Sequence, residues 1–171
     1  MATIHKEIPI DAAPAAVWAA IRDVGAVHRR LTPGFVVDTR LDGDARIVTF
    51  ANGLVARELI VDVDDQARRL AYAATGGRAT HHNASFQVFA ESDNRCRLVW
   101  IIDLLPNDIA GLVGAMVEQG ADIMKRTLER ALPATRKRYA HRLANTSGTN
   151  FQNEARRDIQ NESSSPDAEI A

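Results

Sequence analysis

Apolar and polar residues alternate along most of the first hundred positions, as they do in strands with one buried face. Residues 3–10 alternate in this way and predict a first strand. A short helix is expected to begin at Ala13, with Pro14 in its first turn, where a missing N–H costs nothing. A second short helix is expected over residues 24–31. Six β-rich segments follow, at residues 35–41, 45–51, 54–63, 69–75, 80–91 and 95–105.

Short polar turns separate these six segments and predict their topology. Asn52-Gly53 is the strongest of these signals, and Gly76-Gly77 is another. Turns this short join consecutive strands as hairpins, which build an antiparallel meander. A parallel sheet would need a crossover helix between strands, and none fits here.

A helical pattern begins after Pro106. Apolar residues recur at i, i+3 and i+4 from Ile109 to Ala131, and Asn107 is expected to be the N-cap. About 25 residues at ~1.5 Å each give a helix roughly 37 Å long. Three glycines inside it each cost roughly 1 kcal/mol, which indicates either close contact with the sheet or room for a ligand. They are Gly111, Gly114 and Gly120.

These elements predict an α+β fold in which a seven-stranded antiparallel sheet wraps around a long C-terminal helix, with two short helices after the first strand. We expect one domain over residues 1–143. Residues 144–171, rich in Asn, Ser, Gln and Glu, are expected to form a disordered polar tail. The basic residues within 133–143 fit a solvated helix extension better than a patch for a protein partner.

Composition narrows the function classes. Hydrophobic residues make up 46% and charged residues 25%, which suits a globular protein with a core. The formal charge of -1 argues against a nucleic-acid partner. The only cysteine, Cys96, excludes an internal disulfide and suits the cytoplasm, and it is expected to be a packed side chain rather than a nucleophile. We expect neither a signal peptide nor a membrane span.

The order of elements, together with three local strings, resembles the START-like superfamily, also called SRPBCC or helix-grip. The strings are Ile-Asp-Ala-Ala-Pro-Ala-Ala-Val-Trp-Ala-Ala-Ile-Arg-Asp-Val (10–24), Asn-Gly-Leu-Val-Ala-Arg-Glu-Leu-Ile-Val-Asp-Val-Asp-Asp (52–65) and Arg-Leu-Val-Trp-Ile-Ile-Asp (97–103). The superfamily includes aromatic polyketide cyclases and plant abscisic acid receptors. The resemblance covers about residues 3–132 and implies a ligand-sized cavity between sheet and helix, although a fold alone does not specify the ligand.

One further string, Gly-Gly-Arg-Ala-Thr-His-His-Asn-Ala-Ser (76–85), is similar to the latch segment of the plant receptors. Their gate loop is longer than Gly53-Leu54-Val55-Ala56 and contains a proline that is missing here. Hormone sensing and phosphatase inhibition are therefore not carried over.

Polar residues in phase with apolar neighbours are the candidate cavity residues. On the last strand, comparison with the family's proline-terminated strand puts Val99, Ile101, Asp103 and Leu105 inward and Trp100 outward. Asp103 is then either a cavity carboxylate that acts as a base or a strand-end residue that caps the long helix.

Glu58 matches a pocket-facing glutamate of the receptors, whereas periodicity alone slightly favours the opposite phase of its strand. On the sixth segment, His82 and Phe86 share the apolar, inward phase. His82 is either a hydrogen-bonded lining residue or a general acid or base. His81 and His82 point to opposite faces, so they do not bind one metal ion together, and no metal or cofactor is expected.

Arg29 matches the position of a ligand-anchoring lysine in the receptors, with a solvated helix-end arginine as the alternative. Tyr72, Met116 and Gly120 are the remaining candidate lining residues, although a methionine at helical spacing is usually core.

Three functions stay open at this point. The first is binding or carrying a small hydrophobic molecule, such as an aromatic or polyketide-like compound or a lipid. The second is a cyclase or dehydratase that uses a pocket carboxylate or histidine. The third is a surface interaction module, against which the 5% aromatic content weighs mildly.

Overall fold

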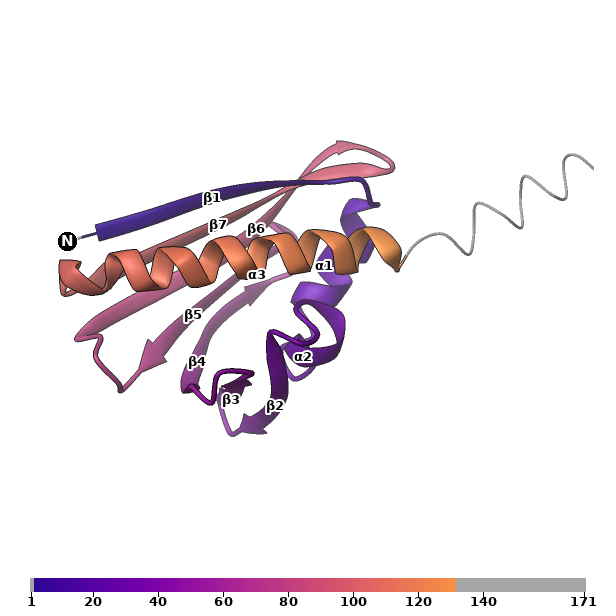
Figure 1. Cartoon of the computed structure of the whole chain (residues 1–171). Helices are drawn as coiled ribbons and strands as arrows, with labels where there is room; N and C mark the ends of the chain where they lie inside the picture. Colours follow the sequence, from indigo (N-terminus) through magenta and orange to yellow (C-terminus); the bar gives the residue numbers. More distant parts are fainter. Residues whose placement is uncertain (1, 132–171) are drawn as a thin grey trace, which may run out of the picture. The chain divides into compact units, whose positions relative to one another are not determined.

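A seven-stranded antiparallel sheet curves around one long helix (Figure 1). The structure is a computed structural model that describes residues 2–131. The predicted basic segment 133–143 and the polar tail 144–171 lie outside these residues. The elements are β1 (Ala2–Ile10), α1 (Pro14–Ile21), α2 (Val27–Arg30), β2 (Val36–Asp42), β3 (Ala45–Phe50), β4 (Val55–Asp64), β5 (Arg69–Thr75), β6 (His81–Ser92), β7 (Arg95–Leu105), a 3₁₀ turn (Asn107–Ile109) and α3 (Ala110–Arg130).

The strand order is β1-β7-β6-β5-β4-β3-β2, and the described pairs are antiparallel. Strands β2 to β7 therefore form the predicted meander, and β1 adds to it beside β7. The helix-grip fold is confirmed, and every strand lies within one or two residues of its expected bounds.

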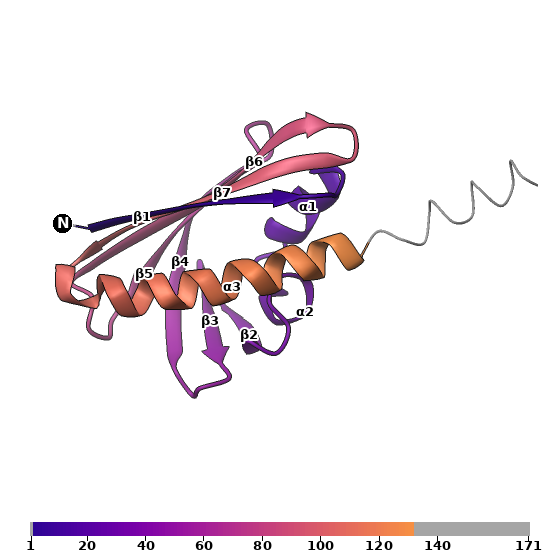
Figure 2. The same cartoon turned by 45° about the horizontal axis from the view of Figure 1, so that its top comes forward.

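Helix α3 crosses the concave side of the sheet and is attached along β1 (Figure 2). Lys6 pairs with Glu118, Lys125 Nζ donates to the Pro9 carbonyl at 2.5 Å, and the Asp11 N–H donates to Glu129 at 3.0 Å. The C-terminal half of the helix packs into the core through Ala121, Met124 and Leu128, which are buried.

Helices α1 and α2 lie near the C-terminal end of α3 and cover that end of the sheet (Figures 1 and 2). Trp18 of α1 is buried and donates its indole N–H to Asp65 in the β4–β5 turn at 2.8 Å. Arg22 pairs with the same carboxylate at 3.0 Å. This end of the space between sheet and helix is therefore filled by protein.

Two expectations about α3 need correction. Asn107 does not cap it: residues 107–109 form a 3₁₀ turn, the α-helix begins at Ala110, and no side chain caps either segment. The glycines also differ from one another. A Cβ on Gly120 would lie 3.4 Å from Phe35 and 3.6 Å from Trp100, so this residue is in close contact, whereas Gly111 and Gly114 face open space.

No helix among residues 2–131 is long and apolar enough to cross a membrane.

Candidate ligand-binding site

A cavity of about 260 Å³ lies between the concave face of the sheet and the N-terminal half of α3. Its walls come from β3, β4, β5, β6, β7 and the segment Ile109–Val117, with the β3–β4 and β5–β6 loops at the mouth. This volume is close to the lower end of the range of small-molecule pockets, about 300–1,000 Å³. Most of the lining side chains are apolar, as is usual for a small-molecule site.

Aromatic rings form two of the walls. Phe35 and Phe50 pack edge to face, with ring centroids 5.3 Å apart. Tyr72 and Trp100 line the sheet side, where the Trp100 indole donates to the Tyr72 hydroxyl at 3.1 Å. Phe86 packs beside them on the same face of the sheet, 4.7 Å from Trp100 and 5.9 Å from Tyr72 between ring centroids. These contacts hold the rings of the sheet side in place.

A buried ion pair joins the sheet side of the cavity. Arg46 on β3 lies directly opposite Glu58 on β4, so both side chains project from the same face. Arg46 Nε donates to Glu58 Oε2 at 2.6 Å, and the two residues are only 3% and 9% exposed. The guanidinium also lies 5.1 Å from the centre of the Tyr72 ring. Glu58 lines the cavity, whereas Arg46, next to it on the same face of the sheet, does not.

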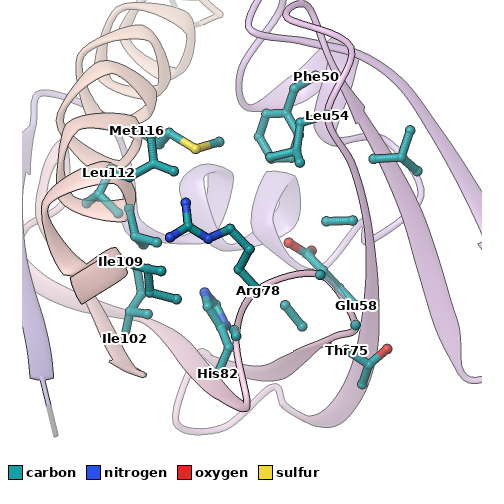
Figure 3. A pocket seen from close by; sticks show the side chains of 18 of the residues that line it. Phe50, Leu54, Glu58, Thr75, Arg78, His82, Ile102, Ile109, Leu112 and Met116 are labelled. Carbon is teal, nitrogen blue, oxygen red and sulfur yellow. The ribbon is translucent and has the colours of Figure 1, made fainter. Parts of the chain in front are cut away.

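His82 projects into the cavity (Figure 3). Burial lowers the pKa of its imidazole, and the nearby Glu58 carboxylate opposes this only partly. The ring is therefore neutral near pH 7. Its Nδ1 is buried and has no hydrogen-bond partner among residues 2–131. Burial likewise raises the pKa of Tyr72, with a further contribution from Glu58, so the phenol also stays neutral.

The mouth combines exposed apolar side chains with one arginine. Leu54 and Leu112 lie on opposite sides of it and are 47% and 60% exposed. Arg78, from the β5–β6 loop, points its guanidinium towards α3 (Figure 3) and lies 3.9 Å from Asp108. Both of these charged side chains are largely exposed, so this pair contributes little to stability.

Within residues 2–131 no three His, Cys, Asp or Glu side chains lie close enough together to hold a metal ion.

Four of the predicted site residues lie at the cavity wall: Glu58, Tyr72, His82 and Met116. Glu58 has the orientation that the family resemblance implied and not the one that periodicity favoured. Contact of these four side chains with a ligand stays a prediction.

The orientation expected for β7 is wrong. Trp100 and Ile102 line the cavity, while Asp103 and Ile101 project from the outer face. Asp103 is paired with Asn83 and Thr3 on the neighbouring strands, and it accepts a 2.6 Å hydrogen bond from the Thr3 hydroxyl. It therefore neither faces the cavity nor caps α3.

The other three predicted residues do not line the cavity either. Phe86 has the expected inward orientation but is 3% exposed and packs against Trp100 beside the cavity. Gly120 lies against Phe35 and Trp100. Arg29 is exposed on α2, as its alternative interpretation required. Cys96 is fully buried, and burial raises its pKa to about 11, which agrees with a packing role.

Sequence reasoning missed Arg46, Trp100, Phe35 and Arg78. Trp100 was open to detection, because Leu98, Trp100, Ile102 and Leu104 form a wholly apolar phase of β7, whereas the phase chosen contains an aspartate. Arg46 required the register of the β3–β4 hairpin. No sequence pattern distinguishes Phe35 or Arg78 from ordinary loop residues.

Comparison with known proteins agrees with this architecture. The profile of the family described as polyketide cyclase/dehydrase and lipid transport matches residues 1–139. A search of curated proteins finds no significant match.

Among solved structures, a START superfamily protein from Mycobacterium smegmatis superposes with a TM-score of 0.60 at 11% identity, over 76% of this chain and 96% of that one. Truncated norcoclaurine synthase from Thalictrum flavum gives 0.61 at 18%, over 77% and 93%. The di-domain ARO/CYC protein BexL from the BE-7585A biosynthetic pathway gives 0.66 at 16%, over 75% and 47%. At these identities the likeness shows the fold alone. With the family match over most of its length, the chain belongs to the polyketide cyclase/dehydrase and lipid transport family.

Proposed function

We propose that the protein binds a small, mainly apolar molecule in the cavity under α3. The observation that carries the proposal is the cavity itself, which is walled largely by apolar and aromatic side chains and contains few polar groups. Its volume of about 260 Å³ favours a compact molecule over a two-chain lipid, most of which would remain outside. Membership of a family that includes cyclases and lipid carriers supports a role for this space.

Filling the cavity tests the proposal. Ala74 lines it from β5, whereas the neighbouring Ala73 projects from the opposite face of that strand. Ala74→Phe should weaken the binding of naphthalene-type probes at least about tenfold, and Ala73→Phe should change it little. Binding would be measured by calorimetry and by the rise in melting temperature, since a ligand specific to the folded state stabilises it. Equal affinities of both variants and the unchanged protein would refute the cavity as the site.

A second candidate function is a cyclase or dehydratase reaction. It is favoured by one observation: His82, neutral near pH 7, and the Glu58 carboxylate line the same cavity. A neutral imidazole there is able to take a proton from an activated carbon of a bound β-keto chain. Cyclisation of a short β-polyketide thioester that is lost in His82→Gln would support this function. Turnover at the same rate in that variant would show that His82 is not the base.

A further inference from the structure

One oxygen of the Glu58 carboxylate has no hydrogen-bond donor among residues 2–131. Oε2 takes the 2.6 Å hydrogen bond from Arg46, and no described side chain or backbone N–H donates to Oε1. Glu58 is 9% exposed, and the surface it retains faces the cavity. A carboxylate oxygen in an apolar space is a strong acceptor, and a donor on the ligand would satisfy it.

The charge of the pair selects the kind of donor. The Arg46 guanidinium is buried, so its charge requires the Glu58 carboxylate as a partner. The two charges cancel, and a ligand cation is not needed to neutralise the site. Bringing an ammonium group into the cavity would add a second cation beside one carboxylate and leave a net positive charge buried there. A neutral hydroxyl instead satisfies Oε1 and carries no charge into the cavity.

A ligand anion is disfavoured at the inner wall for the same reason. Its charge would face the Glu58 carboxylate, and the neighbouring groups, His82 and Tyr72, are kept neutral by burial. Arg78 is a cationic side chain that lines the cavity, but it lies at the solvent-exposed mouth.

The walls select the shape of the ligand body. Of the seven Phe, Tyr and Trp side chains among residues 2–131, four line the cavity. They form two groups, Phe35 with Phe50 and Tyr72 with Trp100, and Phe86 packs beside the second group. Ring faces and edges pack well against another aromatic ring. A flat ring system therefore fits this space better than a flexible alkyl chain.

We infer that the ligand is a neutral aromatic molecule with a hydroxyl group, bound with its ring between the two aromatic groups and its hydroxyl donated to Glu58. The inference rests on the function proposed above and adds the ligand class. Arg46 acts as a positioning residue. It does not line the cavity, but its hydrogen bond holds the Glu58 carboxylate in place at the cavity wall.

Three probes of similar size test it on the unchanged protein: 2-naphthol, 2-methoxynaphthalene and naphthalene-2-carboxylate, by calorimetry at pH 7. The methoxy compound keeps the ring and the oxygen but has no donor. We expect 2-naphthol to bind at least about tenfold more tightly than 2-methoxynaphthalene, since tenfold corresponds to about 1.4 kcal/mol, just below the roughly 1.5–3 kcal/mol of a hydrogen bond to a charged group. The carboxylate should bind least tightly.

The double variant Arg46→Met/Glu58→Leu removes the ion pair as a unit and leaves no orphan charge. It should bind 2-methoxynaphthalene as the unchanged protein does and lose the preference for 2-naphthol. The matched control is Asp42→Leu/Arg57→Met, which removes an exposed pair with a 3.1 Å contact on β2 and β4. This control should keep the preference.

The outcomes separate the two proposals. Equal binding of 2-naphthol and 2-methoxynaphthalene, or tighter binding of the carboxylate, would overturn the hydroxyl inference and leave the binding function intact. A preference that survives in the Arg46→Met/Glu58→Leu variant would also overturn it. If none of the three probes binds, both the inference and the binding function fail. The comparison of probes on the unchanged protein holds even if a variant does not fold.

Discussion

Replacing Arg46 by methionine should lower the free energy of unfolding by about 3–5 kcal/mol, because the Glu58 carboxylate would be left buried without a partner. The side chains of Arg46 and Glu58 are only 4% and 11% exposed, and their 2.6 Å contact excludes water from between them. At an effective dielectric constant of about 20, two unit charges at this distance attract by roughly 6 kcal/mol. Removing both charges from water costs several kcal/mol each, so the net contribution of the pair is small.

The double variant therefore behaves differently from either single variant. Arg46→Met/Glu58→Leu should be within about 1 kcal/mol of the unchanged protein or more stable, because no buried charge is left. Methionine also keeps a contact with Tyr72, whose ring centre lies 5.1 Å from the Arg46 guanidinium carbon, since a thioether packs well on an aromatic ring. The coupling energy between the two sites should then be at least as large as the loss in one single variant.

Urea unfolding of the four proteins, followed by tryptophan fluorescence and circular dichroism, measures this cycle. Trp18 and Trp100 lie at different ends of the space between sheet and helix, so coincident transitions would support two-state behaviour. Losses below about 1 kcal/mol in both single variants would refute the reasoning, because they would mean that water reaches the pair and screens it. A double variant as unstable as the single variants would also contradict it.

Three further predictions address other residues. Gly114→Ala should raise the free energy of unfolding by up to about 1 kcal/mol in urea, because a Cβ there meets nothing within 4 Å and alanine favours the helix; a loss would contradict the open space around it. Asp103→Asn should change the affinity for 2-naphthol less than about twofold by calorimetry, since the carboxylate lies on the outer face, and a tenfold loss would place it at the site. Stability should fall as the pH drops below about 6.5, because the lowered pKa of His82 makes the folded state bind fewer protons than the unfolded chain. Melting temperatures of His82→Gln should fall less steeply over that range, and an unchanged slope would argue against this origin.

The strands and their order were predictable because local chemistry specifies hairpins. Gly53 adopts a left-handed backbone conformation, with φ of +84°, in the turn that the Asn52-Gly53 pair predicts. The amphipathic pattern of residues 109–131 similarly required one long helix that covers a sheet. The wrong orientation of β7 was predicted from a match to a family pattern. Counting the apolar residues in each of its two phases would have predicted the observed orientation.

The Arg46–Glu58 pair shows what periodicity does not supply. The Phe50 N–H donates to the Leu54 carbonyl, so the hairpin loop holds three residues, and Arg46 falls opposite Glu58. A two-residue loop would have placed Ile47 there instead and turned the partner to the other face. The central polar feature of the cavity thus depends on one residue of loop length.

The attachment of α3 along β1 also determines when the cavity forms during synthesis. Strand β1 contacts both β7 and α3 through residues far apart in the sequence. Thr3 and Asp103 of β7 are separated by 100 positions, and Lys6 and Glu118 of α3 by 112. Contacts between such distant residues close large loops, which slows folding. On the ribosome, the meander is able to pair strand by strand as it emerges, but the wall made by α3 arrives only after nearly all of residues 2–131 have been synthesised. A ligand therefore meets a complete cavity only once the sheet and α3 have come together, and it cannot act as a template for the early strands.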